Sequence, residues 1–248
     1  MAFFKTKGII IKEVDTGEAD KVITIFSERE GKITAYAKGA RRPKNSLSAC
    51  SQFLCYSDLL LYSGKEMYNL SSCQLIESFY KLREDMVILT YAAYFAEIIN
   101  DVVQKNEPAV DILKLFLNSL YMLTKGTHDP KLIVRIFEMR LMVFLGYSPS
   151  VNGCILCNST DVSNISFSFQ NCSFICNSCA SLHEPKQKLS PEAARAIQYI
   201  VCSRANSLFN FTVTKSVLNE LEIIFRRYLF ERLEKKYTKL DFLRTLTI

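Results

Sequence analysis

The chain has no tryptophan and only two histidines, His128 and His183, among its 248 residues. Neither histidine lies in a recognisable catalytic triad or metal-ligand pattern, and the sequence has no Gly-x-x-x-x-Gly-Lys-Ser/Thr phosphate-binding loop. ATP hydrolysis is therefore not expected. The adjacent carboxylates Glu84 and Asp85 are typical of a helix start rather than of a catalytic acid–base pair. We expect a protein that is not an enzyme.

Long hydrophobic runs are also missing. No stretch of about 18 apolar residues without charge occurs, so the sequence predicts no membrane span. The first five residues do not build a secretory signal peptide, and the cysteine number, nine, is odd. A reducing cytoplasm is the expected location. Four cysteines in apolar or mixed contexts are expected to be small buried side chains rather than disulfides: Cys50, Cys55, Cys73 and Cys202.

The composition is that of an ordinary globular protein, with 49% hydrophobic and 23% charged residues. The formal net charge is +6. Residues 1–80 and 181–248 carry the excess of lysine and arginine, whereas residues 81–180 are nearly neutral. This distribution favours a polyanionic partner that contacts both ends of the chain.

Two Cys-x-x-Cys pairs form the most specific motif. Cys154 and Cys157 are followed, after 18 intervening residues, by Cys176 and Cys179. This spacing is typical of a zinc site with four thiolate ligands. Residues 165–169 alternate apolar and polar side chains, which predicts a short strand between the pairs. Because four cysteines leave no open coordination position, we expect one structural Zn²⁺.

Other interpretations of these cysteines were weighed. A redox dithiol would need the βαβ setting of a thioredoxin-like motif, which is missing, and two disulfides would fit a secreted chain. Cys172 lies just before the second pair, but using it in place of Cys176 would lengthen the spacing to six intervening residues. His183 follows the second pair by four residues and is an alternative ligand. Both residues are left out of the predicted set.

Residues 1–80 are predicted to be β structure. Five short segments rich in β-branched and aromatic residues are separated by turn signals, at residues 8–11, 21–27, 32–38, 53–62 and 67–76. Five strands without a long helix favour a small closed barrel. The OB-fold, which binds single strands or oligosaccharides on one face, is the first choice, and an SH3-like barrel is the alternative.

From residue 84 onward the apolar residues recur with helical spacing. Helices are expected over residues 84–99, 108–123, 129–145, 190–204 and 217–237. The cysteine segment therefore interrupts a helical domain, and the helices on either side should pack together. The predicted fold class is α+β multidomain: an OB-fold barrel over residues 1–80, a helical domain over 81–149 and 184–248, and a zinc-binding insertion over 150–183.

A basic loop follows the third predicted strand. Lys38, Arg41, Arg42 and Lys44 place four positive charges within seven residues. Arginine pairs with phosphate oxygens through two parallel hydrogen bonds, so the loop is expected to contact a nucleic-acid backbone. A solvated loop without a partner is the alternative. Tyr36, two residues before Lys38, is the preferred ring for base stacking.

The last predicted helix carries a further basic stripe. Its members are Arg226, Arg227, Arg232, Lys235, Lys236 and Lys239. The stripe either extends a DNA-binding surface or is the solvent face of an amphipathic helix whose positive end suits the helix dipole.

The order of these motifs resembles the RecO family of bacterial DNA repair proteins. The resemblance rests on the loop at residues 38–44, the helical remainder and the inserted pair of Cys-x-x-Cys motifs. The opening segments 6–10 and 18–21 are also similar to the first hairpin of that family. The similarity spans essentially the whole chain.

The resemblance implies a recombination mediator of the RecF pathway. Such a protein binds single- and double-stranded DNA, anneals complementary strands without ATP, and works with RecR to load RecA onto DNA coated by single-stranded-DNA-binding protein (SSB). It implies that Lys38, Arg41, Arg42 and Lys44 contact DNA and that the four cysteines hold zinc. It also implies that the C-terminal tail of SSB docks on the helical domain, and that the protein acts in the nucleoid.

Two other classes of function remain open at the level of sequence. One is a zinc-ribbon adaptor that contacts proteins without binding DNA directly. The other is an enzyme with a site that no motif marks.

Overall fold

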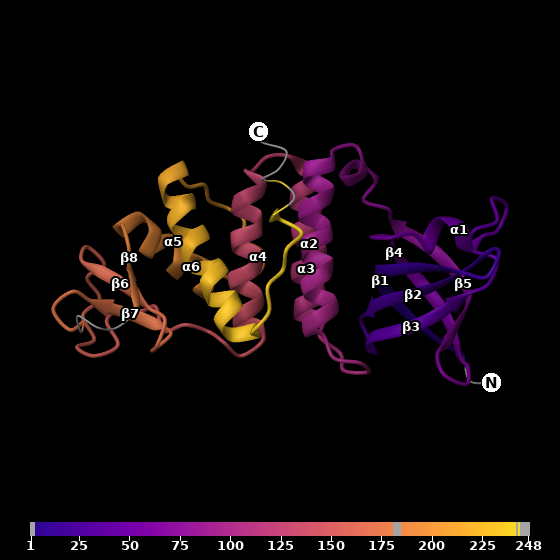
Figure 1. Cartoon of the computed structure of the whole chain (residues 1–248), viewed down its shortest axis with the longest axis horizontal. Helices are drawn as coiled ribbons and strands as arrows, with labels where there is room; N and C mark the ends of the chain where they lie inside the picture. Colours follow the sequence, from indigo (N-terminus) through magenta and orange to yellow (C-terminus); the bar gives the residue numbers. More distant parts are fainter. Residues whose placement is uncertain (1–2, 181–184, 242, 244–248) are drawn as a thin grey trace. The chain divides into compact units, whose positions relative to one another are not determined.

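The computed structural model describes residues 3–180, 185–241 and 243 (Figure 1). The chain divides into two compact units. The first comprises Met1–Thr124 with Tyr237–Ile248, and the second comprises Lys125–Lys236. The barrel and two long helices belong to the first unit, and three helices and the cysteine segment belong to the second.

The first unit contains a closed five-stranded barrel with the order β1-β2-β3-β5-β4. Its strands are β1 (Phe3–Thr16), β2 (Asp20–Ser27), β3 (Gly31–Ala37), β4 (Tyr56–Ser63) and β5 (Tyr68–Glu77). β4 pairs back onto β1, and the β3–β5 pair is parallel whereas the others are antiparallel. The predicted five-stranded barrel is confirmed, with the strand order of an OB-fold.

The barrel core consists of the inward-facing residues of the alternating strands. In β3 every second residue, from Gly31 to Ala37, is buried. Isoleucine and leucine from β1, β2 and β4 fill the interior, together with the short helix α1 (Leu47–Cys50), whose Leu47 joins the same cluster. This helix was not predicted, because four residues are too few to show a helical period.

The cysteines outside the two Cys-x-x-Cys pairs differ from the expectation in two respects. Cys50 of α1 and Cys73 of β5 are joined by a disulfide, with their Cα atoms 6.3 Å apart. The prediction of isolated thiols was wrong for these two, because the barrel brings together residues 23 positions apart. Cys55 is buried, as expected, whereas Cys202 is exposed.

Two long helices complete the first unit, preceded by the 3₁₀ turn η1 (Tyr80–Arg83): α2 (Met86–Val102) and α3 (Val110–Lys125). Asp85 caps α2 by accepting hydrogen bonds from the backbone N–H groups of Val87 and Ile88. Glu84 and Asp85 therefore do mark a helix start. α2 packs against β1, and the linker between α2 and α3 pairs with the start of β3.

The second unit is built on α4 (Pro130–Phe144), α5 (Pro191–Cys202) and α6 (Lys215–Leu233). The side chains of Asp129, Ser190 and Thr214 cap these helices. The three helices pack on one another, so the helix before the cysteine segment does contact the helices after it. Within the part of the chain that the structure describes, every helix is too short or too polar to span a lipid bilayer.

The cysteine segment contains a small sheet with the order β7-β6-β8. Its strands are β6 (Ile165–Ser168), β7 (Ser173–Cys176) and β8 (Lys186–Lys188). β6 is the strand predicted between the two cysteine pairs. We call residues 150–180 and 185–189 the cysteine module (Figure 1, orange).

Candidate nucleic-acid interface and metal centre

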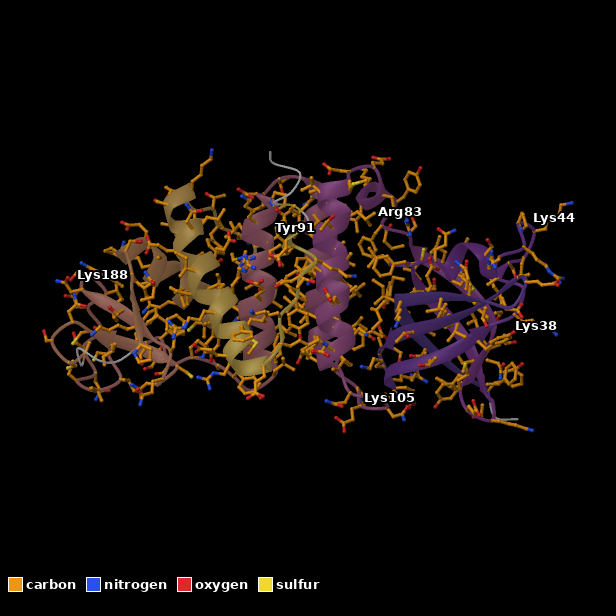
Figure 2. All side chains as sticks on the ribbon, viewed as in Figure 1. Lys38, Lys44, Arg83, Tyr91, Lys105 and Lys188 are labelled. Atoms are coloured by element: carbon orange, nitrogen blue, oxygen red, sulfur yellow. A yellow bond between two sulfur atoms is a disulfide. The ribbon has the colours of Figure 1, made fainter. Side chains whose placement is uncertain are left out.

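The basic loop, residues 38–46, leaves β3 and leads into α1. All four predicted contacts, Lys38, Arg41, Arg42 and Lys44, are exposed. Figure 2 shows Lys38 and Lys44 projecting from the barrel into solvent. Its second residue is Gly39, whose φ of +67° lies in the left-handed region that favours glycine.

Hydrogen bonds hold this loop in a defined shape. The carboxylate of Asp20 accepts a hydrogen bond from the Tyr36 hydroxyl and one of 2.6 Å from the Gly39 N–H. These bonds lower the pKa of Asp20. The Asn45 side chain donates to the Lys38 carbonyl over 3.1 Å. These hydrogen bonds therefore fix the backbone turns from which the positive side chains project.

Tyr36 makes a contact that the sequence did not predict. Its ring is half-buried on β3, and its hydroxyl donates a hydrogen bond to the Asp20 carboxylate at the base of the loop. The hydrogen bond to the carboxylate raises the pKa of Tyr36. Tyr36 therefore positions the basic loop, and base stacking on its ring stays a prediction.

A cavity of about 700 Å³ lies beside the loop, and we call it the loop cavity. Lys38 and Arg42 line it together with Tyr62 of β4. The Tyr62 ring lies 5.4 Å from that of its cross-strand partner Phe3, which is 57% exposed. Two carboxylates, Glu18 and the Asp20 described above, also line the cavity. Cations beside exposed rings are the groups that hold phosphates and stack bases.

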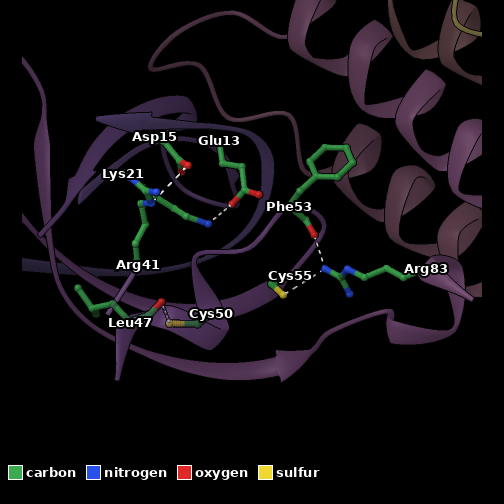
Figure 3. Close-up of polar contacts among 9 residues, drawn as sticks. All are labelled: Glu13, Asp15, Lys21, Arg41, Leu47, Cys50, Phe53, Cys55 and Arg83. Carbon is green, nitrogen blue, oxygen red and sulfur yellow. Dashed lines mark hydrogen bonds and ion pairs between the residues drawn. The ribbon is translucent and has the colours of Figure 1, made fainter. Parts of the chain in front are cut away.

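Arg41 lies beside Asp15 (Figure 3) and lines a different cavity from Lys38 and Arg42. Its Nε lies 3.3 Å from the carboxylate of Asp15, and it borders a second cavity of about 450 Å³. Lys21 in this cavity forms a 2.7 Å ion pair with Glu13. The structure thus brings Lys38 and Arg42 together, separates Arg41 from them, and leaves Lys44 lining neither cavity.

Arg83 closes the far side of this second cavity. Its guanidinium donates to the Phe53 carbonyl over 2.6 Å (Figure 3). It also donates to the Ser78 carbonyl over 2.9 Å. It also lies 3.9 Å from the sulfur of Cys55, whose thiol pKa is raised by burial. Arg83 therefore ties η1 to the barrel.

Two arginines of α6 form ion pairs with glutamates of the same helix. Arg226 pairs with Glu222 at 3.6 Å and Arg227 pairs with Glu231 at 2.7 Å. Both arginines have acidic partners on the same helix, as on the solvent face of an amphipathic helix. They do not form an open basic surface. The sequence left both interpretations open.

Two arginines of α6 also hold the cysteine module. The guanidinium of Arg227 lies 3.9 Å from the ring centroid of Phe169, a cation–π geometry. Arg232 donates to the Phe169 carbonyl over 3.0 Å and contacts the sulfur of Cys172. Both cations thus anchor the same turn of the module to the helix.

Aromatic packing strengthens this attachment. The fully buried Phe167 ring contacts Phe169, Phe174 and Tyr228, with centroid distances of 5.4, 6.4 and 5.6 Å. The Tyr228 hydroxyl donates to the Tyr147 carbonyl over 2.8 Å. Truncation of a buried phenylalanine of this kind to alanine costs about 3–5 kcal/mol of stability. The cysteine module therefore shares a core with α6.

The structure brings the four predicted cysteines to one point. The sulfurs of Cys154, Cys157, Cys176 and Cys179 all lie within 4.8 Å of one another. The sulfurs of Cys157 and Cys176 are 3.8 Å apart. A tetrahedral zinc with bonds of about 2.3 Å would place its ligand sulfurs roughly 3.8 Å apart. The cluster therefore has the dimensions of a four-thiolate metal site.

The surroundings of the sulfurs also suit a cation. Burial raises the pKa of the Cys154 thiol, but backbone hydrogen bonds within both Cys-x-x-Cys turns outweigh burial and lower it to about 6. Hydrogen bonds with Cys176 and Cys157 raise the pKa of Cys179 to about 12. Four sulfurs this close cannot all ionise alone, so a divalent cation is needed to stabilise the full set of thiolates.

Of the two alternative ligands, Cys172 does not belong to this cluster. Cys172 has a φ of +49°, and its sulfur lies 3.6 Å from the Phe169 carbonyl, beside Arg232. It is therefore part of the anchoring turn. His183 lies outside the described residues.

Comparisons with known proteins agree with this architecture. The family model described as "Recombination protein O N terminal" matches residues 1–79, and "Recombination protein O C terminal" matches residues 83–241. A protein named DNA repair protein RecO from Acetivibrio thermocellus is 54% identical over 246 residues, covering 99% of this chain and 98% of the relative. One of the same name from Caldicellulosiruptor saccharolyticus is 36% identical over 242 residues, covering 98% of each chain. The chain belongs to the RecO family of DNA repair proteins.

Proposed function

We propose that this protein is a recombination mediator of the RecF pathway. It binds single- and double-stranded DNA, anneals complementary strands without ATP, and works with RecR to load RecA onto SSB-coated DNA. The observation that carries the proposal is the loop cavity, where Lys38 and Arg42 lie beside Tyr62. Family membership supports the same conclusion.

The physical basis of the activity is electrostatic. Each lysine or arginine that contacts a phosphate releases condensed counterions, and such contacts do not depend on base sequence. Lys38, Arg41, Arg42 and Lys44 supply these contacts on one loop of the barrel. Tyr62 and Phe3 supply rings on which bases can stack.

Strand annealing needs no bond to be made or broken in either backbone. A basic platform reduces the repulsion between two phosphate chains and leaves the base edges free to pair. This role suits a protein whose cavities hold mixed charge rather than an acid–base pair. We therefore propose a mediator that is not an enzyme.

The metal of the cysteine module is proposed to be a single Zn²⁺, held by Cys154, Cys157, Cys176 and Cys179. A zinc ion bound by four thiolates has no open position for substrate and contributes folding free energy. Because Phe167 and Phe169 of the same module pack on α6 residues, the metal would stabilise the second unit as a whole.

RecR and the C-terminal tail of SSB are the proposed protein partners, and the proposed location is the cytoplasm at the nucleoid. An acidic tail ending in an apolar residue requires a basic group beside an apolar groove. The helical part of the chain is the proposed docking region for that tail.

The proposed function is tested by removing the two cations of the loop cavity. In the Lys38→Ala/Arg42→Ala variant, we expect roughly tenfold weaker binding to a 30-nucleotide oligo-dT, measured by fluorescence anisotropy. Lys81→Ala/Lys114→Ala is the matched control, because it removes two exposed lysines from the same unit and the same net charge. Equal binding by both variants and the wild type would favour the zinc-ribbon adaptor that contacts only proteins.

A further inference from the structure

A further cavity, of about 320 Å³, lies in the first unit away from the loop cavity and from the cavity beside Arg41. It is lined mainly by basic side chains. Lys32, Lys65 and Lys105 line it, and one carboxylate, Glu66, lies among them. We call it the hairpin cavity, because the β4–β5 hairpin forms one wall. Figure 2 shows Lys105 at a different end of the barrel from Lys38 and Lys44.

The linker between α2 and α3 forms the opposite wall and is fixed to the barrel. The N–H of Lys32 donates to the Gln104 carbonyl over 3.2 Å, and the N–H of Asn106 donates to the Lys32 carbonyl over 3.4 Å. A Cβ atom on Gly31 would lie 2.0 Å from the Glu107 carbonyl oxygen. The linker thus follows the start of β3 too closely for any side chain at residue 31, and Lys105 is held at the cavity.

The hairpin wall is equally tight. The N–H of Gly64 donates to the Met67 carbonyl over 3.1 Å and closes the turn. A Cβ atom on Gly64 would lie 2.3 Å from that carbonyl oxygen. Lys65 therefore projects from a turn whose backbone is fixed.

The donors around the cavity suit a phosphate. The Lys32 ammonium donates to the Asn100 carbonyl over 2.5 Å, so Lys65 and Lys105, both exposed, are the main cations for a ligand. The neutral donors are the hydroxyls of Thr34 and Ser63 and the amide of Asn106. Three ammonium groups against one carboxylate give the site a net positive charge that favours an anion.

We propose that the hairpin cavity binds the phosphate backbone of a second DNA strand during annealing. Lys32 and Lys38 lie near opposite ends of β3, six residues apart, which corresponds to roughly 20 Å along the strand. Two backbones held at this separation do not compete for the same cations. This inference rests on the proposed function.

The test compares binding of one strand with annealing of two. In the Lys65→Ala/Lys105→Ala variant, we expect affinity for a six-nucleotide oligo-dT within about twofold of wild type, because the loop cavity is intact. The annealing rate of two complementary 30-nucleotide strands should fall roughly tenfold, since the second strand loses its phosphate contacts. Lys81→Ala/Lys114→Ala is again the matched control and should anneal at the wild-type rate.

Each other outcome overturns a different statement. An unchanged annealing rate, with the Lys38→Ala/Arg42→Ala variant still defective, would contradict the hairpin cavity alone. An equal loss in one-strand binding and in annealing would place the cavity on the path of the first strand and refute the second-strand assignment. A wild-type protein that neither binds nor anneals DNA would refute the proposed function itself.

Discussion

Arg41 and Asp15 form an ion pair between the basic loop and the end of β1, with the guanidinium Nε 3.3 Å from the carboxylate. The two side chains are 41% and 59% exposed. An exposed pair of this kind contributes only about 0–1 kcal/mol to stability. Its main consequence is that Asp15 competes with a DNA phosphate for Arg41.

Removal of this competitor should strengthen DNA binding. In Asp15→Asn we expect affinity for single-stranded DNA to rise about two- to fivefold, because Arg41 is freed and one repulsive charge is lost. The melting temperature should hardly change. Glu84→Gln, which removes an exposed carboxylate elsewhere in the first unit, is the control for net charge, and equal gains in both variants would argue against a specific role for the pair.

Tyr62 is the ring expected to stack on a base in the loop cavity. Tyr62→Ala should weaken binding of single-stranded DNA by about 1–3 kcal/mol without changing the dependence on salt, because no phosphate contact is lost. Tyr62→Phe, which keeps the ring, should bind normally. A loss of affinity in Tyr62→Phe equal to that in Tyr62→Ala would point to the hydroxyl instead.

The ionisation of Asp20 should make the free energy of unfolding of the barrel depend on pH. Hydrogen bonds from the Tyr36 hydroxyl, and then from the Gly39 N–H, lower its folded-state pKa below the ordinary value of 3.8. The stabilisation is therefore complete above the unfolded-state pKa and is lost as the pH falls through the folded-state pKa. Unfolding of wild type and Asp20→Asn should differ most above about pH 5, and the two should converge only as the pH falls through the folded-state pKa, below 3.8. A difference that grows in acid would contradict this assignment.

The proposed zinc site is tested by comparing substitution of a ligand cysteine with substitution of a neighbouring cysteine that is not a ligand. Purified wild-type protein should contain about one zinc ion per chain, and Cys157→Ser should lose it. Cys172→Ser is the matched control and should retain the metal, because Cys172 lies on the turn anchored by Arg232. Chelation should also lower the melting temperature of the second unit. A folded wild-type protein without metal, or loss of zinc in Cys172→Ser, would refute the proposed ligand set.

Local patterns in the sequence predicted the elements of this fold well. The cysteine spacing predicted the cluster, because each Cys-x-x-Cys turn brings its two sulfurs close together in space. Runs of β-branched and aromatic residues between turn signals predicted the strands of the barrel, and the helical spacing of apolar residues predicted the five long helices.

Contacts between distant residues could not be predicted in this way. The place of Tyr62 beside Phe3 depends on the register of β1 and β4, and the hydrogen bond from Tyr36 to Asp20 joins residues 16 positions apart. The hairpin cavity joins Lys65 to Lys105, residues that only the docking of the α2–α3 linker on β3 brings together.

The most direct test of the account is the salt dependence of single-stranded DNA binding. Each phosphate contact on a single strand contributes roughly −0.7 to the slope of log affinity against log salt concentration. In the variant with alanine at residues 38, 41, 42 and 44, the slope should become less negative by about 2.8, which corresponds to four lost contacts. A slope equal to that of the wild type would show that the basic loop does not hold the DNA backbone.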